Sequence, residues 1–358
     1  MAERGFDNDD LRAAVSAGIL TEAQASRVIA LAEQRAARRL EIAGEDEPFE
    51  LFRGFAEIFV SVGLILLMVG IVGVSALMGH PLPVLVTSLA LTWVLALYFT
   101  RARRMTLPSI VLSIGFALAL GATIAYFLLR NLNLDSRFVP NAMTLGGLQI
   151  AGLLVWYRVF KVPFTMFLVG LTALWMIFVL TARVMPGVQS LSLTDIFDLR
   201  QSSGLALGSL VFGLLAFVAA MYFDTRDPHR LGRRAASGFW LHLLAAPALV
   251  NTAAMTFYNM GPGQGYLMLA VALGLIGLLA LVIDRRSFLT AGLGYMAFLI
   301  ALVARANGQG LSWAGVILVL GLTITVIGAF WTQMRAVVMR ALPDFPGKDR
   351  LPPYQEKA

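Results

Sequence analysis

The stretch that decides the fold is FAEIFVSVGLILLMVGIVGVSALM, residues 55–78, an apolar run with a single charged residue, Glu57. A helix needs roughly 20 predominantly apolar residues to cross the hydrocarbon core of a bilayer. This run is long enough, and similar runs recur along the chain to about Met334. The pattern predicts an all-α protein: a polytopic bundle of transmembrane helices.

We expect ten spans, separated by short polar breaks. They cover about 55–78, 82–100, 107–129, 142–158, 163–182, 203–223, 235–257, 265–283, 287–304 and 311–333. The fourth run is short and contains Gln149, so a re-entrant or strongly untilted segment is the alternative to an ordinary full span there. Ten spans with both ends on one side also permit a five-plus-five inverted repeat, as in the drug and metabolite transporter superfamily. The similar starts of three runs that follow basic breaks give that repeat only weak support.

The composition agrees with a membrane protein. Hydrophobic residues make up 58% of the chain, charged residues only 14%, and the mean hydropathy is +0.78. A soluble domain needs far more polar residues than this to cover its surface. The chain has no cysteine, which excludes disulfides, thiolate metal sites, iron–sulfur clusters and cysteine nucleophiles. Its first 50 residues are polar and charged, so we expect no cleavable signal peptide.

The connections between the runs predict the orientation, because Lys and Arg accumulate on the cytoplasmic side of a membrane. With the N-terminus inside, the inner connections hold eleven such residues: Arg101, Arg103, Arg104, Arg158, Lys161, Arg226, Arg230, Arg233, Arg234, Arg285 and Arg286. The outer connections hold five: Arg130, Arg137, Arg183, Arg200 and Arg305. We therefore expect both termini in the cytoplasm. Attraction to anionic lipids, rather than nucleic-acid binding, then explains the net charge of +7.

The sequence divides into three parts. Residues 1–48 are expected to form a small cytoplasmic helical hairpin and an acidic linker, residues 49–335 the membrane bundle, and residues 336–358 a cytoplasmic tail. In the hairpin, Gly18 stands where the first helix needs a left-handed residue at its end. Thr21 and Gln24 have the spacing of a capping box that starts the second helix. The hairpin offers a surface for a cytoplasmic protein partner.

The hairpin sequence LRAAVSAGILTEAQA, residues 11–25, resembles the N-terminal region of bacterial predicted membrane proteins grouped as domain of unknown function 2157. The sequence IDRR, residues 283–286, which precedes a later run, is similar to that family as well. The resemblance implies a fold, a bundle of membrane helices, and a location, the inner membrane of a bacterial cell. It transfers no catalytic residue, because the family has no established activity.

Polar side chains inside the expected spans are the candidate functional residues, since burying them in hydrocarbon costs free energy unless they face a partner or water. The candidates for an intramembrane polar site are Glu57, Gln149, His242 and Asn251, with Pro247 as a predicted helix kink. Each has a structural alternative: Glu57 pairs with Arg53, His242 bonds a neighbouring helix, and the amides link helices. We expect Glu57 and His242 to be joined directly or through water in the cytoplasmic half.

Other chemistry has little support. His80, His229 and His242 fall in an outer connection, an inner connection and a span, so they cannot meet around a metal, and we expect neither a metal site nor a cofactor. Asp195 and Asp198 lie in an outer segment and are the one acidic pair that a membrane-embedded transferase would need. We nevertheless expect that the protein is not an enzyme. Two further acids, Asp224 and Asp284, stand at inner helix ends beside arginines, where helix capping or ion pairing is expected.

The best interpretation is a transporter or carrier of a small amphiphile or lipid, with its site among the first, fourth and seventh spans. The alternative is a non-transporting membrane sensor or a subunit of a larger complex, whose N-terminal hairpin binds a cytoplasmic protein. The partners expected in either case are the lipid bilayer and, through the hairpin, a protein.

Overall fold

The structure is a computed structural model. It describes residues 14–21, 24, 28, 55–77, 79–130, 138–184, 197–201, 203–228, 230, 232–288, 313–352 and 354. The chain divides into two compact units, Met1–Asp46 and Glu47–Ala358. We call the second the helical unit, and each is described by itself.

In the N-terminal unit, the end of one helix and the start of the next are built as the sequence predicts. Gly18 has a φ of 68°, and the Gly18 N–H donates to Val15 O (3.0 Å) while the Ile19 N–H donates to Ala14 O (2.9 Å). These are the two hydrogen bonds of a Schellman motif. The Thr21 N–H donates to Gln24 Oε1 (2.9 Å) and the Gln24 N–H to Thr21 Oγ1 (3.3 Å), which completes the capping box.

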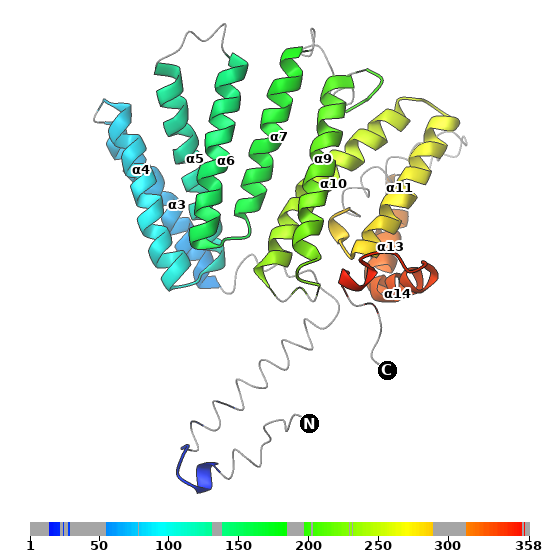
Figure 1. Cartoon of the computed structure of the whole chain (residues 1–358), viewed down its shortest axis with the longest axis horizontal. Helices are drawn as coiled ribbons and strands as arrows, with labels where there is room; N and C mark the ends of the chain where they lie inside the picture. Colours follow the sequence, from blue (N-terminus) through cyan, green and yellow to red (C-terminus); the bar gives the residue numbers. More distant parts are fainter. Residues whose placement is uncertain are drawn as a thin grey trace. The chain divides into compact units, whose positions relative to one another are not determined.

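Every regular element that the structure describes in the helical unit is helical, as expected for the fold class. The elements are α3 (Phe55–Ala76), α4 (Pro81–Ala96), the π-helical turn η1 (Leu97–Ala102), α5 (Thr106–Arg130), α6 (Phe138–Phe160), α7 (Thr165–Val184), α9 (Ser203–Asp224), α10 (Arg233–Tyr258), α11 (Gln264–Ile283), α13 (Trp313–Ala329), α14 (Trp331–Ala341) and the 3₁₀ turn η3 (Lys348–Arg350). The long helices stand side by side and run from one end of the unit to the other (Figure 1).

Seven described helices are long and apolar enough to cross a membrane, or eight if a bent pair near the C-terminus counts as one. They fit a multi-pass membrane protein. The seven correspond to the first four and the sixth to eighth expected spans, and α7 is a shorter apolar helix in place of the fifth. Most of the expected ninth span, 287–304, lies outside the described residues.

The fourth span is longer than expected. Helix α6 begins at Phe138, four residues before the expected start, and its 23 residues are long enough for a full span. Pro140 lies in the first turn of α6, where a helix does not need the backbone N–H that proline lacks. The proline therefore does not prevent the helix from starting at Phe138, although Pro140 and Asn141 shorten the apolar run.

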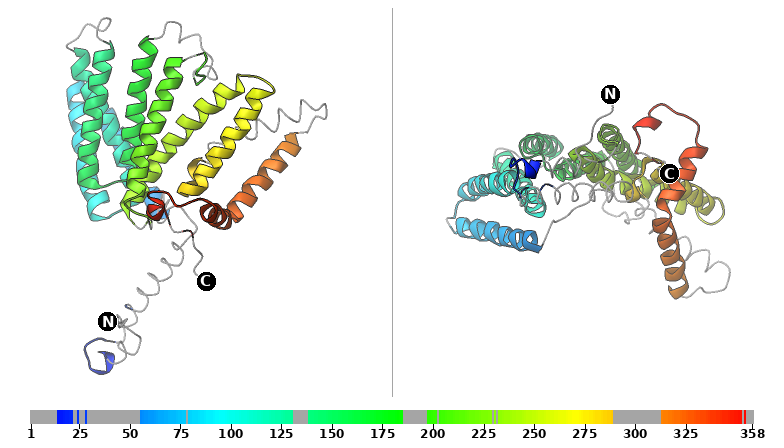
Figure 2. Two further views of the ribbon diagram at one scale, coloured as in Figure 1. Left: turned by 45° about the vertical axis from the view of Figure 1, so that its right-hand side comes forward. Right: turned by 90° about the horizontal axis from the view of Figure 1, so that it is seen from below.

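The expected tenth span, 311–333, is wrong at its C-terminal side. Helix α13 ends at Ala329, and the chain bends by 68° between α13 and α14. Figure 2 shows the two helices pointing in different directions. The reason is the pattern of α14, whose buried residues Trp331, Arg335 and Met339 recur every four positions on one face. Such an amphipathic segment carries charges that a lipid-crossing helix avoids.

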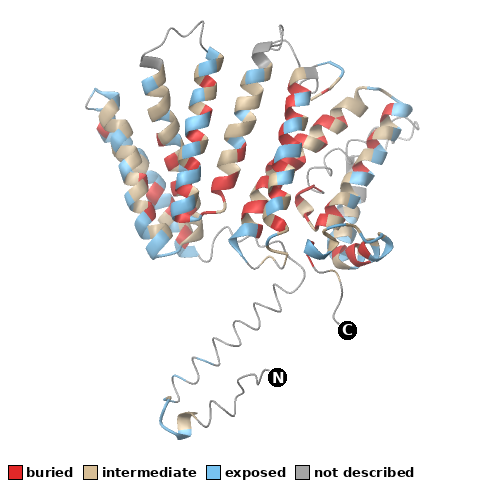
Figure 3. Ribbon diagram, viewed as in Figure 1, coloured by how far each residue is buried: buried red, intermediate tan, exposed pale blue. Residues whose placement is uncertain are grey.

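Packing is densest in the middle of the helical unit. Helix α10 contacts α7, α9 and α11. The main described neighbours of α3 are α4 and α5. Figure 3 shows buried residues concentrated on α9 and α10 and exposed ones along α3 and α4. A second core joins α4, α5 and α6 through Trp93, Phe116 and Trp156, with the Phe116 and Trp156 rings stacked 4.3 Å apart. The large apolar side chains exposed on the outer helices are the surface that lipid would cover.

Candidate functional site: a buried ionic cluster between α9, α10 and α11

Three ionisable side chains meet where α9, α10 and α11 converge. Asp224 Oδ2 accepts a hydrogen bond from Arg285 Nε (3.0 Å) and lies 2.9 Å from His242 Nε2. Asp224 Oδ1 accepts a second hydrogen bond from the same guanidinium, which makes the ion pair bidentate. The side chains of His242 and Arg285 are fully buried, and that of Asp224 is 6% exposed. We call these three residues the ionic cluster.

The backbone brings the three together from distant parts of the sequence. Asp224 is the last residue of α9. Asp284, directly after α11, has a φ of 56°, and this left-handed residue ends α11 one position before Arg285. The Arg285 guanidinium also donates to Ala235 O (3.0 Å) in the first turn of α10. Gly238 makes room, since a Cβ there would clash with the Asp224 carboxylate and lie 3.2 Å from Ala220 O.

A second set of ionic contacts surrounds Asp284. Its carboxylate lies 3.0 Å from Arg230 Nη1 and 3.8 Å from Arg335 Nε, and it accepts a hydrogen bond from Trp331 Nε1 (2.7 Å). Arg335 also donates to Leu281 O (3.1 Å) and to Pro352 O (2.6 Å). Asp284 therefore ties the end of α11 to α14 and to the connection between α9 and α10. The expected ion pairing of Asp224 and Asp284 is confirmed.

The imidazole of His242 has an apolar side. Its ring lies 5.6 Å from the Phe217 ring and 5.7 Å from the Phe288 ring, both edge-on. The Nδ1 atom is buried and has no hydrogen-bond partner among the described residues. One nitrogen thus contacts the Asp224 carboxylate while the other is available to a proton or a water molecule.

Glu57 does not meet His242, contrary to expectation. Both carboxylate oxygens of Glu57 accept hydrogen bonds from the Thr106 N–H (3.1 and 3.2 Å), and one also accepts from the Leu107 N–H (3.0 Å). The first amides of a helix have no partner within the helix, and a negative charge there complements the helix dipole. Glu57 on α3 therefore caps α5. The suggested partner Arg53 lies outside the described residues.

The remaining candidates do not converge on the ionic cluster. Gln149 on α6 donates through Nε2 to Ala117 O on α5 (2.8 Å), so it links two helices as its structural alternative predicts. Asn251 is half-buried on α10. Pro247 lies inside α10, which continues from Arg233 to Tyr258. The proposed polar site is thus spread over separate helix contacts, and only His242 among its members belongs to a cluster of charges.

Of the acidic pair suggested for an enzyme, the structure describes only Asp198. Asp198 is buried and accepts hydrogen bonds from Asn259 Nδ2 (2.8 Å) and from the Arg200 N–H (2.8 Å). Its carboxylate thus ties the segment before α9 to the end of α10. Asp195 and His229 lie outside the described residues. Within the described part of the chain, no group of three His, Cys, Asp or Glu side chains has the spacing to hold a metal.

No protein-family model, curated protein or solved structure matches this chain. The resemblance to domain of unknown function 2157 proteins therefore stays a prediction.

Proposed function

We propose that this multi-pass membrane protein is a carrier that moves a lipid or another small amphiphile across the bilayer. The ionic cluster would control the packing of α9 against α10 and α11. The observation that supports this proposal is the full burial of His242 and Arg285 against Asp224 within apolar helices. Replacing a buried ion pair with apolar residues is often neutral or stabilising. A bundle that needed only stability would not require this cluster.

The cluster offers a way to couple movement to a proton. Asp224 and Arg285 balance each other in charge when His242 is neutral. Histidine is the side chain whose charge changes most readily near neutral pH, and a proton on His242 would place a second positive charge beside Arg285. The contact between α9 and α11 would then be weakened when His242 is protonated, at the lower pH, and retained when His242 is neutral, at the higher pH. Pro247, about one and a half turns along α10, removes one backbone hydrogen bond and makes bending easier there.

Lipid movement in vesicles tests the proposal. Purified protein is reconstituted, and the rate at which a fluorescent short-chain lipid crosses the bilayer is compared with the rate in protein-free vesicles. The wild type should accelerate crossing, and His242→Gln should reduce the rate, whereas Leu215→Ala on the exposed face of α9 should not. If wild-type and protein-free vesicles behave alike for anionic, zwitterionic and single-chain amphiphiles, the carrier proposal fails.

A second candidate is a sensor or complex subunit that binds a cytoplasmic protein through its N-terminal unit, with both chain termini in the cytoplasm of a bacterial cell. Two apolar side chains of that unit, Ile19 and Val28, are 75% and 40% exposed, and an exposed apolar surface of this kind suits a partner. Deleting residues 1–44 separates the candidates. Lipid movement should survive the deletion if the helical unit is the carrier, whereas a cellular phenotype of the deletion without loss of movement would favour the sensor.

A further inference from the structure

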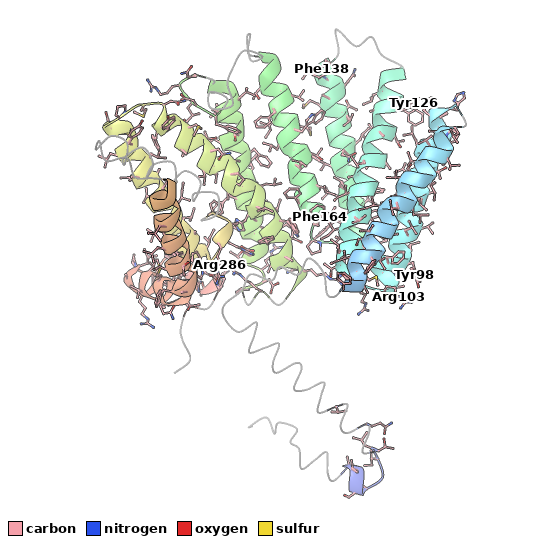
Figure 4. The ribbon with its side chains drawn as sticks, turned by 180° about the vertical axis from the view of Figure 1, so that it is seen from behind. Tyr98, Arg103, Tyr126, Phe138, Phe164 and Arg286 are labelled. Atoms are coloured by element: carbon pink, nitrogen blue, oxygen red, sulfur yellow. The ribbon has the colours of Figure 1, made fainter. Side chains whose placement is uncertain are left out.

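A cavity of about 470 Å³ lies between η1, the end of α6 and the start of α10. It lies at the end of the helical unit where Figure 4 shows Tyr98, Arg103 and Arg286. Five of the residues that line it are cationic: Arg101, Arg104, Arg158, Lys161 and Arg233. No acidic residue is among the lining residues. We call this the basic cavity.

The cations of the basic cavity are unlike the other arginines nearby. Arg230 and Arg285 pair with aspartates at the ends of α11 and α9. None of the five lining cations forms an ion pair with a described acidic residue. Five like charges around one cavity repel one another, and a bound anion would remove that repulsion. The first amides of α10 are already taken, because the Asp227 carboxylate accepts hydrogen bonds from the Gly232 N–H (2.8 Å) and the Ala235 N–H (3.4 Å). The anion would therefore be bound by the cationic side chains.

The backbone around the cavity is irregular. Arg104 and Lys161 have φ values of 53° and 55°, a left-handed conformation that is uncommon for residues with a side chain. Thr100 and Arg101 belong to η1, a π-helical turn. Such turns occur frequently at functional sites. Two strained cationic residues and one π-helical turn thus border the same cavity.

Thr100 supplies a hydroxyl group without a partner. Several threonine hydroxyls in the α-helices donate to the carbonyl four residues back, as Thr92 does to Ser88 O (2.9 Å) and Thr172 to Leu168 O (2.8 Å). Thr100 lines the cavity from the π-helical turn, and its buried Oγ1 has no hydrogen-bond partner among the described residues. A buried hydroxyl left unpaired is costly, and a ligand oxygen in the cavity would satisfy it.

We propose that the basic cavity binds a phosphate group, either of an anionic lipid headgroup or of a free phosphate. Guanidinium groups match the geometry of phosphate oxygens through paired hydrogen bonds, and the four arginines of the basic cavity suit a doubly charged anion better than a carboxylate. Basic pockets between membrane helices on the cytoplasmic side are suited to anionic headgroups. As a description of the carried substrate, this inference rests on the proposed function; as a binding site, it stands without it.

Calorimetry on the full-length protein in detergent tests the site. The probes are short-chain phosphatidic acid, inorganic phosphate and, as the zwitterionic reference, short-chain phosphatidylcholine. The test variant is the double substitution Arg158→Gln with Arg233→Gln, two exposed residues whose replacement leaves the core intact. The matched control is Arg103→Gln, since Arg103 follows η1 but is not a lining residue and instead lies 5.6 Å from the Tyr98 ring.

The wild type should bind phosphatidic acid or phosphate saturably, and the double variant should bind at least tenfold more weakly, because each charge-assisted hydrogen bond contributes about tenfold or more. Arg103→Gln should bind as the wild type does, and the double Lys variant at positions 158 and 233 should recover part of the affinity. Tighter binding of phosphatidic acid than of phosphate identifies a lipid headgroup as the source, and equal binding identifies free phosphate.

Two results would overturn the site: no saturable binding of either phosphate probe, or equal affinity in the wild type and the double variant. The vesicle assay keeps this failure apart from failure of the carrier. Saturable phosphate binding without lipid movement would refute the carrier proposal and keep the binding site. Lipid movement that is equal in the wild type and the double variant, with no phosphate binding, would refute the binding site and keep the carrier proposal.

Discussion

The substitution Asp224→Asn probes the ionic cluster most sharply, because it removes one charge and almost no volume. It leaves Arg285 fully buried and without its anionic partner. One oxygen that accepts a hydrogen bond becomes an NH₂ group facing either the guanidinium or the imidazole. Breaking a buried ion pair by removing one partner costs about 3–5 kcal/mol. We expect the free energy of unfolding to fall by about that amount.

The assay is reversible unfolding in mixed detergent micelles, followed by tryptophan fluorescence. The matched control is Asp344→Asn: Asp344 pairs with Lys348 at 3.2 Å, but its side chain is 99% exposed, so this substitution should have no measurable effect. The double variant Asp224→Asn with Arg285→Gln should be less destabilised than the sum of the single variants, because no unpaired charge remains. Equal stability of the Asp224→Asn and Asp344→Asn proteins would refute the reasoning.

Two further predictions concern residues outside the cluster. Replacing Glu57 by Gln weakens a cap on α5 and should lower the free energy of unfolding by about 1 kcal/mol, measured in the same detergent titration. Lipid movement should stay unchanged. A loss of lipid movement at wild-type stability would return Glu57 to the functional site. Reporter fusions after Arg104, Asp227, Arg286 and the C-terminus should read cytoplasmic and those near His80, Ser192 and Gly263 external; an external C-terminus would contradict the predicted orientation.

Most spans could be predicted from the sequence, because runs of about 20 apolar residues have no stable alternative to a membrane helix. The end of the tenth expected span could not be located, because Phe330 and Trp331 continue the apolar run although the helix axis turns at Phe330, between Ala329 and Trp331. The four-residue period of Trp331, Arg335 and Met339 was the available signal for α14. The π-helical turn η1 has no comparable signal in the sequence.

The ionic cluster was predictable only in part. The sequence shows that Asp224 and Asp284 stand near arginines at helix ends, and that His242 is a polar residue inside an expected span. Which arginine meets which aspartate depends on the left-handed turn after α11 and on how α9 and α10 align. That alignment depends on close contacts such as the one at Gly238, which no helical periodicity reveals. Glu57 was assigned to the wrong partner for a similar reason, since the start of α5 lies 49 residues away in sequence.

The most direct test of the carrier proposal is the rate of lipid movement in vesicles between pH 5 and pH 8, the range in which histidine changes charge, for the wild type and for His242→Gln. The charged groups that face His242 are Asp224 from α9, Arg285 after α11 and Arg230 from the connection between α9 and α10. We predict that the wild-type rate changes with pH across this range and that the His242→Gln rate does not. Identical pH profiles for the two proteins would contradict a role for the ionic cluster in movement.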